Sequence, residues 1–215
     1  MKKIFTVTFF MLAVFSNFAL AKTSGSYVGI DLLNSKVKFF EQYTNATHPT
    51  ITDHKPSFTH NDYGLGLHYS YAVNNNGLFI APGLIFEQNN ATAHGYGDQA
   101  LQRLKIKNRY GAKIDFGFDA TDMIAPYITG GYAAITHSSR EYFNEDTITR
   151  TRSGTSMEWF YGAGIIFNCN KSASINIEYT TQNFRVRNST EGSVALVSFY
   201  QTRLDILKFG ISYRF

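Results

Sequence analysis

The sequence has little cysteine and little proline, and after its first 21 residues it has no apolar run long enough for a transmembrane helix. A single cysteine, Cys169, excludes a framework of disulfide bonds, so stability must come from strand pairing and burial. The formal net charge of +4 is too small to indicate a dedicated nucleic-acid binder. Aromatic residues and glycine are abundant, with 19 Phe, 14 Tyr and 17 Gly, and this composition favours β-structure.

The first residues have the order of a secretory signal peptide. Lys2 and Lys3 form a basic start, residues 4–15 form a short apolar run, and residues 19–21 (Ala-Leu-Ala) form a small-x-small cleavage site. We therefore expect residues 1–21 to be removed after Ala21, which leaves residues 22–215 as a single exported domain.

The last residues, KFGISYRF, alternate strictly between apolar and polar or small side chains. This period of two predicts a strand with one apolar face. The same pattern recurs along the whole mature chain. It predicts eight strands, at residues 26–33, 61–73, 78–86, 103–119, 126–136, 155–167, 174–186 and 207–215.

The connections between these eight segments alternate between long and short, beginning and ending with a long one. An outer-membrane barrel has this arrangement, with brief periplasmic turns and long outer loops. A closed sheet also satisfies every backbone polar group inside lipid and leaves no open edge. We therefore predict an all-β fold: an eight-stranded antiparallel up-and-down transmembrane β-barrel with long extracellular loops and short periplasmic turns, present as a monomer.

The C-terminal strand resembles a known signature. Phe209, Ile211, Tyr213 and Phe215 stand at alternating positions before the end of the sequence, as in the C-terminal signature of bacterial outer-membrane proteins. The chain as a whole is similar to the small opacity-protein and OmpA-type barrels that act as surface antigens. The resemblance implies a place in the outer membrane of a Gram-negative bacterium, contact with outer-membrane lipid, and recognition of the signature by the barrel-assembly machinery.

The polar positions of the strands are expected to face the lumen, which in an eight-stranded barrel is just wide enough for side chains. The candidate lumen charges are Arg103, Lys105, Arg109, Lys113, Asp115, Glu158 and Glu178, accompanied by Asp31, His68, Lys208 and Arg214. Because both signs are present and buried charges need partners, we interpret these residues as a paired plug. A narrow cationic channel near residues 103–113 remains the alternative.

Aromatic residues near the short-turn ends predict a girdle at one membrane interface. Its expected members are Tyr27, Tyr71, Phe79, Phe118, Tyr127, Phe167 and Phe215. Cys169 is expected in a periplasmic turn.

The fourth long connection is apolar although it should stand in water. Val194, Leu196, Phe199 and Tyr200 are therefore candidates for a partner-binding loop. The alternative interpretation is that the two flanking strands extend above the membrane as a hairpin.

These patterns favour a non-enzymatic surface protein whose outer loops contact a host or environmental ligand, without a metal or cofactor. A small porin-like channel for polar solutes is the main alternative. A lipid A-modifying enzyme is a third, and it would use His137 and Ser139, with Glu141 or Glu158 orienting the imidazole.

Overall fold

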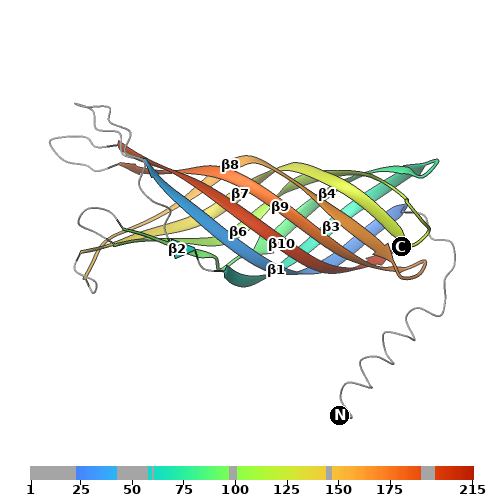
Figure 1. Ribbon diagram of the computed structural model, residues 1–215, viewed down its shortest axis with the longest axis horizontal. Helices are drawn as coiled ribbons and strands as arrows, with labels where there is room; N and C mark the ends of the chain where they lie inside the picture. Colours follow the sequence, from blue (N-terminus) through green and yellow to red (C-terminus); the bar gives the residue numbers. More distant parts are fainter. Residues whose placement is uncertain (1–22, 43–57, 60, 97–100, 144–146, 190–196) are drawn as a thin grey trace, which may run out of the picture.

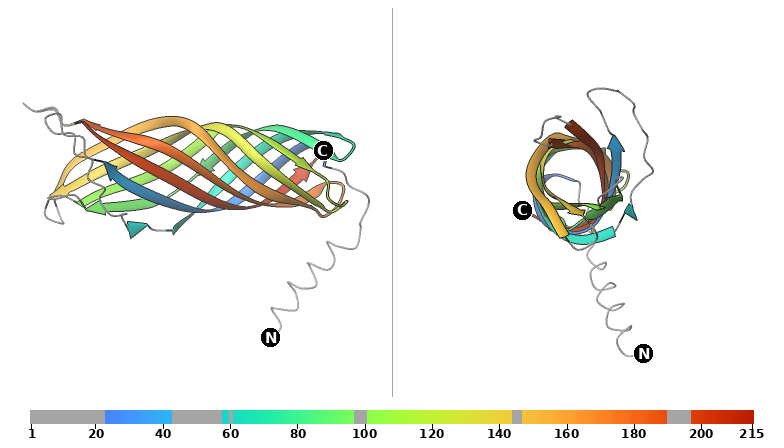
Figure 2. Two further views of the ribbon diagram at one scale, coloured as in Figure 1. Left: turned by 45° about the horizontal axis from the view of Figure 1, so that its top comes forward. Right: turned by 90° about the vertical axis from the view of Figure 1, so that its left-hand side faces the viewer.

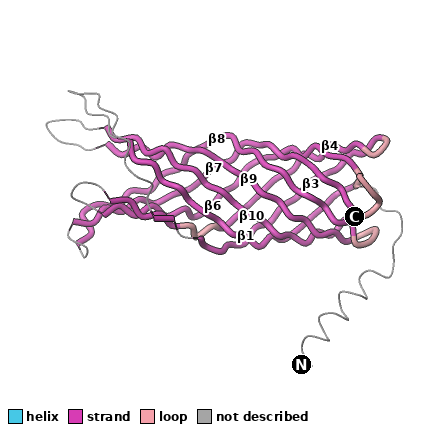
Figure 3. Tube along the Cα trace, in the orientation of Figure 1, coloured by secondary structure: helices cyan, strands magenta, loops and turns pink. Residues whose placement is uncertain are grey.

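The structure, a computed structural model, describes residues 23–42, 58–59, 61–96, 101–143, 147–189 and 197–215. The expected signal peptide therefore lies outside the described residues. Almost all of the described chain is β-strand (Figure 3). No helix within these ranges is long and apolar enough to cross a membrane.

Eight long antiparallel strands close into a barrel (Figure 1), which confirms the predicted fold class. The strands are β1 (Gly25–Gln42), β3 (Asn61–Asn75), β4 (Leu78–Gln88), β6 (Leu101–Phe118), β7 (Ile124–Phe143), β8 (Thr147–Asn168), β9 (Ala173–Ser189) and β10 (Val197–Arg214). Two short strands, β2 (Phe58–Thr59) and β5 (Thr92–Tyr96), pair with each other, and β5 also pairs with β6. The view along the axis in Figure 2 shows the resulting ring.

The first and last strands close the ring. β1 pairs with β10 from Tyr27 opposite Arg214 to Gln42 opposite Phe199. Backbone hydrogen bonds continue this ladder past its last register pair, because Ser26 and Phe215 donate to each other's carbonyl oxygens at 3.2 and 3.1 Å. The C-terminal strand is thus paired on both edges, with β1 and with β9.

The turns at one end of the barrel are short, as predicted. The turn between β3 and β4 consists of Asn76 and Gly77, whose φ angles of 52° and 89° lie in the left-handed region. Two such residues match the strand twist of a tight hairpin, and asparagine and glycine tolerate positive φ best. Cys169 lies in the short turn between β8 and β9, as expected, and burial raises the pKa of its thiol.

The outward face of the wall carries one continuous apolar band around this end of the barrel. It comprises alternate residues of 28–32, 63–73, 78–86, 110–118, 128–132, 157–167, 175–179 and 207–215. The exposed fractions of Trp159 and Ile211 are 71% and 69%. Apolar side chains this exposed would be unfavourable in water, whereas the acyl chains of a lipid bilayer cover them. We identify this band as the membrane-spanning part of the wall.

The strands extend well beyond the apolar band, which corrects the expected strand boundaries. β8 alone has 22 residues, whereas a tilted membrane span needs about 9–11. The expected third loop, residues 137–154, consists largely of β7 and β8, and most of the expected fourth loop belongs to β9 and β10. Polar residues in these stretches suggested loops, but they form the outer surface of strands that stand in water.

Candidate functional site

The lumen of the membrane-spanning part holds a network of buried ion pairs. Glu178 on β9 accepts hydrogen bonds from Lys208 at 2.5 Å and from Lys113 at 2.9 Å. Lys208 also contacts Glu87 at 2.7 Å, and Lys113 contacts Asp115 at 2.9 Å. These side chains come from β4, β6, β9 and β10, so the network crosses the lumen from wall to wall.

Arg109 forms the upper member of this network. Its guanidinium donates to Glu87 at 3.0 Å and to the Thr180 hydroxyl at 3.3 Å. It also lies 4.2 Å from the ring centroid of Phe160, a cation–π arrangement. Arg109 is fully buried, and this placement is compatible with a charged group only because a carboxylate and an aromatic face surround it.

A second polar chain lies on the periplasmic side of the network. The imidazole of His68 hydrogen-bonds to the Asp31 carboxylate at 2.8 Å and to the Ser212 hydroxyl at 2.9 Å. Gly29 makes room for this ring, because a Cβ there would stand 2.3 Å from the His68 Cε1 atom. The order acid, imidazole, hydroxyl is that of a hydrolase triad, and sequence reasoning had not brought these residues together.

The space beside Ser212 is too small for a substrate. The cavity there measures about 30 Å³ and is lined by His68, Lys113, Asp115, Asn176 and Ser212 among others. Since one water molecule occupies roughly 10–15 Å³ on this measure, the cavity has room for about two waters. The buried Asp115 Oδ1 and Asn176 Oδ1 atoms, for which the described residues supply no donor, are suitable partners for such waters. The geometry therefore favours a hydrated structural cluster.

The sequence-predicted lumen charges divide into two groups. Arg109, Lys113, Asp115 and Glu178 lie buried in the lumen. Glu158 faces the same side but is only half-buried. The sequence indicated this inward position because these residues occupy the polar alternate positions of strands β6, β8 and β9.

The assignment of Arg103 and Lys105 to the lumen is wrong. The pairing of β6 with β7 shifts at a bulge between Ile106 and Asn108, so the inward and outward parities exchange there. Above the bulge, Leu104 and Ile106 are buried, and Lys105 is exposed on the outer side of the wall. Arg103, two residues away and on the same side of the strand as Lys105, is partly exposed. The basic residues that suggested a cationic channel are therefore not together in the lumen.

The predicted aromatic girdle also needs correction. Tyr27, Phe79 and Tyr127 point inward, with exposed fractions of 5% or less, and pack together near the periplasmic end of the lumen. The Tyr127 hydroxyl donates to Glu178 at 2.9 Å, which a lipid-facing ring could not do. Tyr71, Phe118 and Phe215 are exposed on the outer face, and Phe167 is half-buried.

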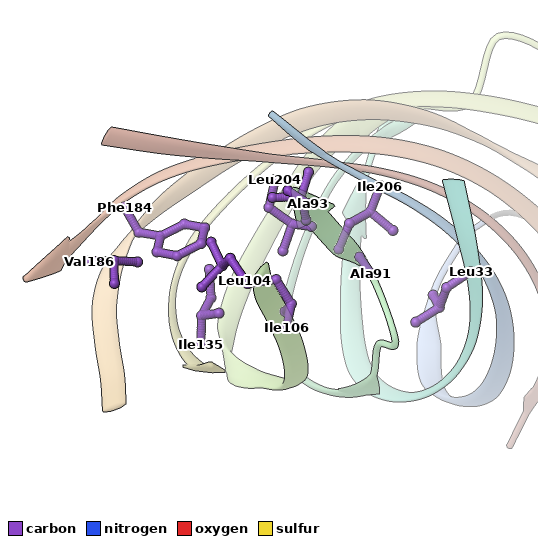
Figure 4. Close-up of a cluster of buried hydrophobic side chains, with 11 residues drawn as sticks. Leu33, Ala91, Ala93, Leu104, Ile106, Ile135, Phe184, Val186, Leu204 and Ile206 are labelled. Carbon is purple, nitrogen blue, oxygen red and sulfur yellow. The ribbon is translucent and has the colours of Figure 1, made fainter. Parts of the chain in front are cut away.

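Above the apolar band the lumen is filled by a cluster of eleven buried apolar residues, shown in Figure 4. The cluster consists of Leu33, Val37, Ala91, Ala93, Leu104, Ile106, Ile135, Phe184, Val186, Leu204 and Ile206. Sequence reasoning missed it, although a signal exists: on β1, Leu33 and Val37 share the parity of the lumen residue Asp31. This cluster gives the extracellular half of the lumen an apolar interior.

The candidate partner-binding loop changes its character in the structure. Val194 and Leu196 lie outside the described residues, whereas Phe199 and Tyr200 belong to strand β10. In the ladder between β1 and β10, Phe199 stands opposite Gln42 and Tyr200 opposite Glu41. These two residues therefore lie in a wall that extends above the membrane, as the hairpin alternative proposed.

His137 is placed unsuitably for a catalytic base. Its ring is buried on β7 beside Phe184, with 6.1 Å between the ring centroids. Its Nε2 atom lies 3.4 Å from the Ser156 hydroxyl, and no described residue gives its Nδ1 atom a hydrogen-bond partner, so no carboxylate among the described side chains orients the ring. Burial lowers the pKa of this imidazole below its ordinary value, which favours the neutral form.

The predicted assembly residues share the outward face of β10. Phe209, Ile211, Tyr213 and Phe215 are exposed in the apolar band, with the rings of Tyr213 and Phe215 stacked at 6.3 Å between centroids. Their register partners on β1 include Ile30 for Ile211. The same face thus serves lipid contact in the folded barrel.

The chain is similar to several solved outer-membrane proteins, and of the three described next the one with a TM-score above 0.5, OprG, supports the fold. The outer membrane protein OprG from Pseudomonas aeruginosa is 13% identical, with a TM-score of 0.56, and the match covers 92% of this chain and 99% of that one. Ail, the attachment invasion locus protein of Yersinia pestis, is 14% identical with a TM-score of 0.48, and the match covers 89% of this chain and 99% of Ail. Neisserial surface protein A is 16% identical with a TM-score of 0.49, and the match covers 89% of this chain and 98% of that protein. No curated protein matches the sequence.

The family assignment rests on a match over nearly the whole chain. The family model of the outer membrane protein beta-barrel domain matches residues 5–215. The closed eight-stranded sheet, its apolar outer band and the likeness to OprG are consistent with this match. The chain therefore belongs to the outer membrane protein β-barrel family, whose place is the outer membrane of Gram-negative bacteria.

Proposed function

We propose that this chain is a non-enzymatic surface protein whose extracellular strands and connections contact a ligand outside the cell. The observation that carries the proposal is the folded extension above the membrane, in which an apolar cluster inside supports a polar surface outside. A barrel that served only to cross the membrane would not need strands of 20 and 22 residues. A rigid wall that carries exposed polar side chains is a common way to present a binding surface.

The lumen supports a binding role over a channel role. Ion pairs from Glu87 and Glu178 to their three cationic partners cross the membrane-spanning part. The apolar cluster then fills the lumen above them. A polar solute would have to displace both layers, and their ion pairs would have to break in a medium of low dielectric.

Two measurements test this proposal. The purified barrel in planar bilayers should give no large, discrete, long-lived current steps, and such steps would instead establish the channel alternative. Cells that display the whole chain should adhere to immobilised matrix proteins or serum factors more than cells that display an unrelated eight-stranded barrel. Equal adhesion across a broad panel of such ligands would contradict the binding role.

Phe199 and Tyr200 remain candidate contact residues, because their backbone lies in the extension above the membrane. Replacing both with alanine should weaken adhesion several-fold or more, since truncating two buried aromatic anchors of an interface typically costs about 2 kcal/mol or more. Equal surface expression of variant and wild type is the necessary control. Unchanged adhesion would remove these two residues from the binding surface.

The proposal includes export and assembly. Residues 1–21 act as the signal peptide, and the alternating residues up to Phe215 act as the signal for the assembly machinery. Mass spectrometry of the mature protein should find Lys22 at the N-terminus. Replacing Phe215 with serine should lower the amount of assembled barrel, seen as heat-modifiable migration on gels, while an unchanged amount would contradict that role.

A further inference from the structure

A group of cationic side chains lies on the outer face of β1 and β10, directly above the apolar band. On β1 the band ends at Leu32, and the outward positions above it include Lys36 and Lys38. The two strands lie side by side (Figure 1), and their register places Lys36 opposite Asp205 and Lys38 opposite Arg203. We call Lys36, Lys38, Arg203 and Asp205 the rim cluster. Because the short turns are at the other end of the barrel, this cluster lies on the extracellular side.

One carboxylate holds the rim cluster together. Asp205 lies 3.4 Å from the Lys38 ammonium and accepts a hydrogen bond from the Arg203 Nε atom at 2.8 Å. The Thr181 hydroxyl on β9 also donates to Asp205, at 2.8 Å. The Asp205 side chain is 8% exposed, whereas the side chains of Lys38 and Arg203 are each 40% exposed. The acid is thus enclosed by its neighbours, and its two cationic partners remain accessible from outside.

The rim cluster carries more positive than negative charge. Lys36, Lys38 and Arg203 are three cations and Asp205 is one anion, so the net charge is +2. Among the described side chains on the outward face of β1, β9 and β10 above the band, Asp205 is the acidic residue. Asp62 on the neighbouring β3 has inward parity and accepts a hydrogen bond from a backbone amide of β5 at 3.0 Å. Since like charges directly opposite each other on a sheet are destabilising, Lys38 and Arg203 favour a further anion between them.

The rim cluster lies at the height of lipid headgroups. From Leu32 to Lys36 the chain advances roughly 13 Å along a tilted strand, which is about 10 Å in height. Long basic side chains can bend back over this distance toward the headgroup layer. Tyr179, the uppermost residue of the band on β9, interacts electrostatically with Asp205 and Arg203. A tyrosine whose ring faces lipid and whose hydroxyl meets polar groups is typical of a membrane interface.

We propose that the rim cluster binds a phosphate group of a lipid in the outer leaflet of the outer membrane. A phosphate monoester carries about −1.5 to −2 charges at neutral pH, which matches the net charge of the cluster. The ammonium groups of Lys36 and Lys38 and the guanidinium of Arg203 donate to the phosphate oxygens, and Asp205 positions two of these donors. This inference goes beyond the proposed function, because its ligand belongs to the membrane and does not come from outside the cell.

The first test compares two lipids on the wild-type barrel. The whole barrel in detergent is mixed with lipid A, or with the same lipid after enzymatic removal of its phosphates, and native mass spectrometry counts the lipid molecules that stay bound. EDTA is present throughout, so that no divalent cation can bridge the phosphate to the protein. Lipid A should be retained at least about fivefold better than the dephosphorylated lipid, because charge complementarity is lost with the phosphates. Equal retention of the two lipids would overturn the inference.

The second test compares two pairs of substitutions. Lys38→Gln together with Arg203→Gln should lower the retention of lipid A to that of the dephosphorylated lipid. Lys105→Gln together with Lys107→Gln removes the same charge from exposed positions of β6 above the band, and this matched control should retain lipid A as the wild type does. Equal losses in both double variants would show a general attraction of positive charge to lipid, and would overturn the assignment of a site. Heat-modifiable migration confirms that each variant is folded.

Chemical modification locates the lipid. In nanodiscs that contain lipid A, Lys36 and Lys38 should be acetylated less than in nanodiscs that contain the dephosphorylated lipid, whereas Lys105 should be acetylated equally in both. The phosphorylated sugar headgroup without acyl chains should protect neither Lys36 nor Lys38. Equal protection by this soluble headgroup would assign the cluster to a soluble anion and overturn the lipid assignment. The adhesion of cells that display the barrel tests the proposed function separately, because it depends on an added ligand and not on lipid retention.

Discussion

The two halves of this barrel use the same strands with opposite polarity. In the membrane-spanning half, β1 places Ile30 outside and Asp31 inside, whereas in the extracellular half it places Lys36 outside and Val37 inside. The change occurs without any change in strand parity on β1, since every odd residue from Tyr27 to Val37 is buried. The medium around the wall therefore determines which kind of residue each face carries.

The reversal also changes what stabilises each half. Lipid surrounds the lower wall, so its closure depends on backbone pairing and on the buried ion pairs of the lumen. Water surrounds the upper wall, so burial of the eleven-residue apolar cluster supplies a hydrophobic driving force there. Four substitutions separate these two mechanisms, in order of decreasing expected effect.

The largest effect is expected from Glu178→Gln in the membrane half. Glu178 accepts from Lys113, Lys208 and Tyr127, so the neutral amide leaves two buried ammonium groups without their shared carboxylate. Loss of one partner of a buried pair typically costs about 3–5 kcal/mol. Urea unfolding followed by the fluorescence of Trp159, the only tryptophan, measures the change. Glu158→Gln is the control and should change stability by less than about 1 kcal/mol, and equal effects of the two substitutions would contradict the role of the network.

The next effect concerns the outer face of the lower wall. Ile114 on β6 is 54% exposed within the apolar band, so Ile114→Lys places a charge in lipid. Such a charge costs about 2–4 kcal/mol near the bilayer midplane. Lys105→Leu on the same strand, above the band, should change stability by less than about 0.5 kcal/mol. Folding yield in vesicles and the urea midpoint measure both, and a tolerated lysine at position 114 would mean that the band is misplaced.

A smaller effect separates burial in protein from exposure to lipid on a single strand. Ile135 on β7 is fully buried in the apolar cluster, whereas Ile128 on the same strand is 63% exposed to lipid. Ile135→Val should therefore lower the unfolding free energy by about 1 kcal/mol, because it removes a buried methylene group. Ile128→Val should lower it by less than about 0.5 kcal/mol, since lipid fills the space. Equal losses in urea unfolding would show that the upper cluster is not a packed core.

The smallest effect is a dependence on pH in the extracellular half. Burial lowers the pKa of His137, so the unfolded chain takes up its proton first, near pH 6.5. Stability from the neutral ring is thus complete above about pH 6.5 and decreases as the pH falls below it. The thermal midpoint of the wild type should fall more between pH 8 and pH 5 than that of His137→Gln. Identical decreases in both proteins would show that the ring gains no stability from being neutral.

The sequence allowed most of the membrane-spanning half to be predicted. Alternation on every strand gave the count of eight, the antiparallel closure and the inward position of Arg109, Lys113, Asp115 and Glu178. This was possible because lipid requires an apolar residue at every second position, and few substitutions escape that requirement. The sequence pattern predicted loops for the extracellular half, because the polar residues on the outside of its strands have the same composition as a loop in water.

By itself, the sequence determined the barrel, its outer band and its short turns, since these depend on residue type at a fixed spacing along the chain. Only the tertiary structure decided the features that residue spacing does not fix, namely side-chain orientation beyond a bulge and contacts between separate strands. The bulge at Ile106 moved Lys105 to the outside, and no local pattern fixes which residue of a ladder stays unpaired. The contact of His68 with Asp31 and Ser212 joins residues from separate strands whose register depends on closure of the whole ring.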